Sequence, residues 1–268
     1  MYGAYSGSRF VVAGTPSGVS LAPEGGAHQS TITASVGLEL PGVTFVEPAY
    51  ATALDWLLCD ALGRIASADD GPTTGAEVRA YYFRLSTRPV DQAPFEAART
   101  RLGDAVLRRQ VLAGAYRLVD AQHDHPALRE QQAPVVHLVT SGAVVAETVA
   151  AAAELAEEGV AAHVVDACSL ARLYAAWRGG LRDGVRSATV PAMPGALRSA
   201  FADRAPVVTV YDAHSHAMAW LGSALGVPCV PLGVDEFGQS GSVHDLYELH
   251  DLLPGSIVNA AIAALSLA

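Results

Sequence analysis

Apolar runs and helical patterns alternate along the first third of the chain. Residues 9–14, 43–46 and 78–85 are short runs rich in branched and aromatic side chains, which predict buried strands. Residues 30–40 begin with a hydroxyl residue and keep helical spacing up to a Pro-Gly pair, and residues 49–66 repeat leucines on one face after a proline. The order strand, loop, helix, strand, helix, strand predicts part of a parallel sheet.

The second half of the chain shows the same alternation more clearly. Its predicted strands are residues 135–140, 160–166, 205–212 and 227–232, and its predicted helices are residues 143–158, 169–177, 216–225, 243–250 and 255–267. Both halves therefore indicate an α/β protein.

The polar, proline-containing residues 122–134 separate the two patterns. We interpret them as a linker between a domain of residues 1–121 and a domain of residues 135–268. Residues 86–134 otherwise give a mixed pattern, with a candidate strand at residues 113–118.

The first predicted sheet is small. It starts within about ten residues of Met1 and holds roughly three strands, whereas the usual sheet has about five. A sheet of this size leaves a bare edge and an open apolar face. We expect either a partner chain that completes it or an unusual fold.

Composition narrows the classes of partner and chemistry. The chain is 51% apolar and carries a net charge of −10, which argues against nucleic acid or an anionic membrane as partner. It contains no lysine, and all 17 basic residues are arginine, so it has no Schiff-base, P-loop or kinase-type lysine. Neither a G-x-S-x-G nor a G-x-G-x-x-G motif occurs, which disfavours a serine hydrolase and a dinucleotide site.

Cysteine usage and hydropathy indicate a cytoplasmic protein. Cys59, Cys168 and Cys229 stand far apart in apolar surroundings, which predicts small buried side chains in a reducing compartment rather than reactive thiols. No apolar run reaches membrane-spanning length, and the first ten residues lack the pattern of a signal peptide.

The segment with most chemistry is residues 14–29, GTPSGVSLAPEGGAHQ. Its glycines allow close backbone approach to a ligand, and it carries one carboxylate, Glu24, and one imidazole, His28. An imidazole titrates near neutrality, so it can donate a proton to an alkoxide or bind a carbonyl. From the residues alone, a structured turn remains the alternative.

Longer stretches of the sequence resemble one enzyme family. EGGAHQS resembles the histidine motif of transketolases and of homodimeric pyruvate dehydrogenase E1 subunits, and the surrounding residues 6–58 resemble the latter half of their pyrimidine-binding domain. YYFRLSTRPVDQ, RRQVLAGAYRL and PLGVDEFGQSGS resemble later parts of the same enzymes, so the resemblance covers nearly the whole chain. It implies part of a pyrimidine-binding parallel-sheet domain followed by a three-layer αβα domain like the transketolase C-terminal domain.

The resemblance also implies roles for single residues. His28 matches the family histidine that faces the reactive carbon of the cofactor, and Glu24 matches an acidic residue that recognises a substrate hydroxyl. Substrate contacts are further implied for Thr15, Ser17, Gln29 and Arg88. For Arg88, a strand-end ion pair is the competing interpretation. Pro16 stands where transketolases carry a phosphate-binding histidine, which weakens the interpretation as a simple sugar-phosphate transketolase.

Two family parts are missing from the sequence. The cofactor-activating glutamate lies upstream of the histidine motif in the family, and no GDG…N motif for diphosphate and Mg²⁺ occurs here. The resemblance therefore implies thiamine diphosphate and Mg²⁺ bound together with a partner subunit, in an α2β2 assembly, that carries the diphosphate domain and the first half of the pyrimidine domain.

The implied reaction moves a two-carbon unit from a 2-oxo acid or a ketose to an acceptor such as a lipoyl or acyl carrier protein. A ketol transfer from a ketose phosphate in a natural-product pathway stays open, as does a non-catalytic assembly subunit.

Asp212-Ala213-His214-Ser215-His216 is a second cluster of chemically active side chains. A D-x-H-x-H run at the end of a strand can bind a metal ion, but the trailing Asp-His of hydrolase motifs is replaced by Ala217-Met218. We therefore favour hydrogen-bonded histidines at an interface over a metal site.

Overall fold

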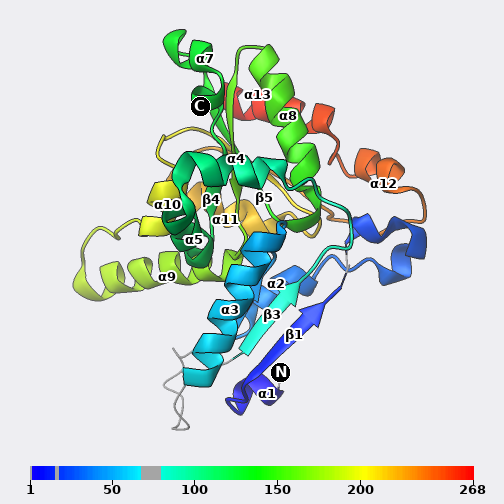
Figure 1. Cartoon of the computed structure of the whole chain (residues 1–268), viewed down its shortest axis with the longest axis vertical. Coiled ribbons are helices and arrows are strands. Elements are labelled where there is room, and N and C mark those ends of the chain that lie inside the picture. Colours follow the sequence, from blue (N-terminus) through cyan, green and yellow to red (C-terminus); the bar gives the residue numbers. More distant parts are fainter. Residues whose placement is uncertain (1, 16–17, 68–79) are drawn as a thin grey trace.

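The computed structural model describes residues 2–15, 18–67 and 80–268, which form two α/β units side by side (Figure 1). The first unit contains three described strands, β1 (Phe10–Gly14), β2 (Val43–Val46) and β3 (Ala80–Arg84). They are parallel and lie in the order β1-β3-β2. The predicted α/β class and the small first sheet are both confirmed.

Two helices support this sheet. Helix α2 (Thr33–Glu39) packs on β2, where Gly37 leaves room for the Phe45 ring, and α3 (Ala51–Ser67) buries Leu57 against the core. Strand β1 stays open, because no described strand pairs with its outer side and Val12 is 46% exposed. The bare edge expected from the sequence is therefore present among the described residues.

The second unit is a five-stranded sheet between two layers of helices. Its order is β4 (Tyr116–Val119), β6 (Ala161–Asp166), β5 (Val135–Thr140), β7 (Val207–Val210) and β8 (Cys229–Leu232). All described neighbours are parallel except β4, which runs antiparallel to β6 at the edge.

Both faces of the second sheet are buried. Helices α8 (Val145–Glu157) and α13 (Pro254–Ser266) cover one face, and α10 (Gly195–Ala200) and α11 (His216–Leu225) lie on the other (Figure 1). Continuous apolar strands are typical of a parallel sheet covered on both sides. This is the three-layer αβα arrangement that the resemblance implied.

The region between the sheets is more ordered than the sequence pattern indicated. Residues 86–134 contain α4 (Ala93–Leu102) and α5 (Asp104–Ala113), and the expected linker contains α6 (Ala121–Asp124) and α7 (Pro126–Glu130). Strand β4 precedes the expected linker in the chain but hydrogen-bonds to β6 in the second sheet. A domain boundary at 122–134 therefore follows the first strand of that sheet.

Two local expectations need correction, and part of a third lies outside the described residues. Cys168 is buried as expected, but Cys59 is exposed because its position on α3 faces away from the core, and Cys229 is partly buried. Helix α9 (Leu170–Ser187) continues ten residues beyond the expected end at residue 177, through Gly179-Gly180. Two of the residues in the expected strand 78–85, Val78 and Arg79, lie outside the described residues.

One stretch of the described chain, Val243–Ser266, is long and apolar enough to cross a membrane by composition alone. The structure divides it into α12 (Val243–Leu249) and α13, and α13 buries Ile257 and Ala261 in the core. Core helices of globular proteins pass the same composition test, so these two helices are explained as core elements.

Candidate functional site

The segment that carries Glu24 and His28 is folded into two short turns. Residues 18–29, the histidine loop, form the 3₁₀ helices η1 (Val19–Glu24) and η2 (Gly26–His28), joined at Gly25 with φ of 83°. The side chains of Glu24 and His28 are both exposed at the end of this loop. A positive φ of this size suits glycine, so the turn chemistry of the segment agrees with its sequence.

One hydrogen bond orients the His28 ring. Its Nδ1 lies 3.2 Å from the main-chain oxygen of Glu24. Since a carbonyl oxygen only accepts, the contact requires the proton on Nδ1. In the neutral ring, Nε2 is then the basic nitrogen, and it has no partner among the described residues. The ring can therefore take a proton from, or return it to, a group in front of the loop.

The beginning of the histidine loop is fixed by Asp212, which follows β7 of the second sheet. Its carboxylate accepts hydrogen bonds from the main-chain N–H of Val19 at 2.7 Å and from Ser20 Oγ at 2.6 Å. Gly18 passes directly over this carboxylate, and a Cβ at Gly18 would lie 2.2 Å from Asp212 Cγ. The close fit explains why a residue without a side chain stands there.

The end of the same loop is held by residues 235–242, also from the second unit. Gln29 is 6% exposed, and its Nε2 donates to the main-chain oxygen of Gln239 at 2.9 Å. Gly26 passes close to the backbone of Gly238, where a Cβ would meet the carbonyl oxygen at 2.0 Å. The exposed tip with Glu24 and His28 is thus suspended between two attachments to the second unit.

A buried polar network lies beneath the loop, where the two sheets meet. Glu47 follows β2, and its carboxylate binds the Arg84 guanidinium and accepts from Tyr211 Oη at 2.5 Å. Arg84 also donates from Nη2 to the main-chain oxygen of Asp212 at 2.6 Å, and Ser141 Oγ donates to the main-chain oxygen of Glu47 at 3.0 Å. We call these five residues the junction. Burial raises the pKa of the Glu47 carboxyl, and the Arg84 charge opposes that rise.

The junction occupies the place where an open α/β sheet usually binds its ligand. The strand order reverses between β5 and β7, and ligands of such sheets bind in the crevice at the carboxyl ends beside this reversal. Here Ser141 follows β5 and Tyr211 follows β7, and Glu47 of the first unit lies between them. The space left at the junction is about 10 Å³, so the crevice is filled.

Other residues expected from the sequence lie around this centre. Thr15 is exposed just after β1, and Ser17 lies outside the described residues. Arg88 forms an ion pair with Glu147 at 2.9 Å and donates to Tyr247 Oη at 2.7 Å. These bonds match the strand-end ion pair that we weighed as the alternative, and they do not support a substrate contact of Arg88. The buried amide of Gln29 likewise faces the protein.

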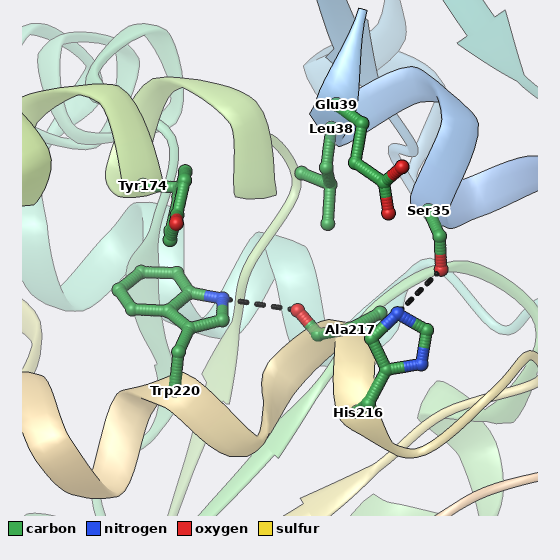
Figure 2. A pocket seen from close by; sticks show the side chains of 7 residues that line it. All are labelled: Ser35, Leu38, Glu39, Tyr174, His216, Ala217 and Trp220. Carbon is green, nitrogen blue, oxygen red and sulfur yellow. Dashed lines mark hydrogen bonds between the residues drawn. The ribbon is translucent and has the colours of Figure 1, made fainter.

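The two histidines of the D-x-H-x-H run serve separate contacts. His216 Nε2 lies 3.0 Å from Ser35 Oγ of α2, which joins the two units, and His214 Nδ1 lies 3.0 Å from Asp235. Figure 2 shows the first contact at the edge of a pocket of about 420 Å³, with Trp220 on its other side. Within residues 2–15, 18–67 and 80–268, no group of three or more His, Cys, Asp or Glu side chains could hold a metal ion.

Sequence reasoning missed Glu47 and Arg84, and it singled out Asp212 without its role in holding the loop. Glu47, Arg84 and Asp212 each follow or end a predicted apolar strand, which is where parallel sheets place functional side chains. That position was the available signal. It could not show which strand ends meet, because Asp212 and Val19 are 193 residues apart in the chain.

Comparison with known proteins gives a family match and related structures. The family described as transketolase-like TK C-terminal domain matches residues 114–252. A curated relative, the 6-deoxy-6-sulfo-D-fructose transketolase subunit SqwH of Clostridium sp. strain MSTE9, is 28% identical over 262 residues, which are 96% of this chain and 66% of that protein. The chain thus spans slightly less than two thirds of this relative.

Solved transketolases share the fold at low identity. The Leishmania mexicana transketolase has a TM-score of 0.64 at 19% identity, over 98% of this chain and 31% of that one. A mutant transketolase of Pichia stipitis has a TM-score of 0.69 at 16% identity, over 98% of this chain and 31% of that one. A structure described as a split gene transketolase, inactive beta4 tetramer, has a TM-score of 0.56 at 18% identity, over 96% of this chain and 66% of that one.

Proposed function

The chain belongs to the transketolase family and corresponds to the C-terminal part of a transketolase-like enzyme, and from this premise we propose that it is one subunit of a split enzyme. The assembled enzyme would transfer a two-carbon unit. The observation that carries the proposal is the exposed Glu24–His28 tip, which the fold holds at both ends and leaves open in front.

The surface of the first unit supports a partner chain. Strand β1 has an open outer edge among the described residues, and an unpaired strand edge is a template for pairing with another chain. The first unit also exposes several large apolar side chains. They are Tyr2, Tyr5, Val12, Ile32, Val36, Leu58 and Leu62. We propose that the partner carries the diphosphate-binding domain and the first half of the pyrimidine domain, in a cytoplasmic α2β2 assembly.

The cofactor of the family is thiamine diphosphate with a divalent metal ion. The described residues offer no cluster of side chains for Mg²⁺, so we assign the diphosphate and the metal ion to the partner. The exposed imidazole of His28 fits a contact at the edge of such a cofactor. When bound, thiamine diphosphate supplies the carbon centre that holds the two-carbon fragment.

The residues of this chain would manage protons and orientation. His28, with its proton fixed on Nδ1 by Glu24, would accept a proton from a substrate hydroxyl at Nε2 and return it after the bond is cleaved. The Glu24 carboxylate would accept a hydrogen bond from a second hydroxyl. Both roles require a polyhydroxylated substrate, so we favour a ketose donor, in keeping with the sugar in the name of the curated relative.

A 2-oxo acid donor with a lipoyl or acyl carrier as acceptor is the second candidate. It rests on the sequence resemblance to pyruvate dehydrogenase E1 and on Pro16, which stands where transketolases carry a phosphate-binding histidine. The two candidates differ in which donor is consumed.

The test uses the chain assembled with its partner. Ketose phosphates, sulfo-ketoses and 2-oxo acids are offered in turn, and turnover is compared among wild type, His28→Ala and His123→Ala, an exposed histidine of α6 as control. Loss of a general acid–base group predicts a fall of roughly 10²–10⁴-fold for His28→Ala and none for His123→Ala. Equal turnover of all three proteins, with normal assembly, would favour the non-catalytic subunit.

A further inference from the structure

The histidine loop belongs to the first unit by sequence, but the second unit holds it in place. We propose that Asp212 is a positioning residue of the catalytic site, which sets the location of Glu24 and His28 through the first turn of η1. This inference rests on the proposed function for its catalytic part. Its structural part, the fixation of the loop by Asp212, stands without it.

The contacts of Asp212 are concentrated on this one task. The side chain is 1% exposed, and its two oxygens face Val19 N, Ser20 N and Ser20 Oγ at 2.7, 3.4 and 2.6 Å. The N–H groups at the start of a helix have no partner within the helix. A carboxylate there satisfies them and is favoured by the helix dipole. Asp212 thus supplies from the second unit what the N-cap of η1 lacks locally, since Gly18 has no side chain.

The position of Asp212 is itself fixed. Its main-chain oxygen accepts from Arg84, whose guanidinium is held by Glu47, and Glu47 is held in turn by Tyr211. A chain of buried polar contacts therefore runs from both sheets to the start of the loop. Loss of the carboxylate would release Val19 and Ser20 while leaving the sheets in contact through the remaining junction residues.

The geometry makes the length of the side chain as important as its charge. Because Gly18 lies against the carboxylate, a longer acidic side chain at position 212 would push the loop outward. A displacement of about 1 Å in a catalytic group can cost on the order of 10²-fold in rate. Asp212→Glu, which keeps the charge, should therefore fail to restore activity. A role limited to charge predicts restoration.

The competing interpretation is that Asp212 only stabilises the contact between the two units. Ser35→Ala is the matched control, because it removes the Ser35–His216 contact between the two units and alters neither the junction nor the histidine loop. If Asp212 acts on the loop, the Asp212 variant and the control variant must differ in measurements made on the loop itself.

Hydrogen exchange of the full chain, followed by mass spectrometry, provides the measurement without any assay of activity. Asp212→Asn is expected to raise exchange at least tenfold in peptides within residues 19–28, and Ser35→Ala is expected to leave them unchanged. Ser20→Ala, which removes one donor at little change in volume, should give a smaller rise. Unaltered exchange in Asp212→Asn overturns the proposal.

Kinetics of the assembled enzyme then tests the catalytic part. Asp212→Asn and Asp212→Glu should lower kcat by 10- to 100-fold with KM changed less than threefold, and Ser35→Ala should keep kcat within threefold. Normal kcat in Asp212→Asn with a released loop overturns the positioning role. If His28→Ala is also fully active, the proposed function fails, yet the exchange result still decides whether Asp212 fixes the loop.

Discussion

A buried carboxylic acid at the end of β6 should make the stability of this protein depend on pH in an unusual direction. Asp166 is fully buried, accepts a hydrogen bond from Tyr116 Oη at 2.7 Å on one oxygen, and has no partner for Oδ1 among the described residues. Burial raises the pKa of Asp166 to about 7, and the Tyr116 hydrogen bond offsets only part of that rise.

The sign follows from proton linkage. The folded protein keeps the Asp166 proton up to a pH of about 7, whereas the unfolded chain, with the ordinary value of 3.8, loses it near pH 4. The stabilisation is therefore fully present below about pH 4 and is lost as pH rises to about 7. One pKa unit corresponds to about 1.4 kcal/mol, so between pH 5 and pH 8 the contribution of Asp166 falls by roughly 2–3 kcal/mol.

Asp166→Asn removes this titration and keeps an acceptor for Tyr116. Urea unfolding of wild type and variant at pH 5, 6, 7 and 8 gives the difference in unfolding free energy at each pH. Between pH 5 and pH 8, this difference in unfolding free energy should shift by about 2–3 kcal/mol in favour of the variant. Other titrating groups contribute equally to both proteins, so their contributions cancel in the difference. A difference that stays constant across this range would refute a neutral, buried Asp166.

Three further variants test the junction and a helix end. Arg84→Met leaves the buried Glu47 carboxylate without its cation, so urea unfolding should show a loss of about 3–5 kcal/mol, and the double variant with Glu47→Gln should recover most of it; an additive double variant would contradict the pairing. Gly142→Ala places a Cβ 2.5 Å from Glu47 Oε1 at a φ of 63°, so thermal unfolding should show a loss of about 1–3 kcal/mol in stability. An unchanged melting curve would mean that the site has room for the methyl group. Ser242→Ala removes the capping box of α12, worth about 1 kcal/mol by urea unfolding, and Ser242→Asp should restore it if capping is the cause.

The sheets could be predicted because their signal is local. Strands such as residues 135–140 and 43–46 are apolar runs bounded by turn residues, and a parallel sheet buried on both faces produces such runs. The helices α4 and α5 were missed for the opposite reason. Each buries only two side chains, Phe95 and Ala98 in α4 and Leu107 and Val111 in α5. The apolar repeat is therefore too sparse to predict a helix.

The candidate site, like the fold, could be predicted from the sequence only where its signal is local. Glu24 and His28 could be singled out because the chemistry and the glycines occur in one short segment. Their roles are still proposals. Asp212, Glu47 and Arg84 could not be assigned from the sequence, since their importance comes from contacts between strand ends far apart in the chain. A polar residue after a strand has many possible partners, and only the packing of one sheet on another selects among them.

The placement of β4 has a practical consequence for anyone who wishes to express the αβα part by itself. A fragment that starts at residue 135 would lack Tyr116–Val119 and would present the freed side of β6 to other molecules as a template for association. It would also strip Asp166 of its Tyr116 hydrogen bond. The fragment that keeps a capped sheet begins before residue 116, close to residue 114 where the family match starts.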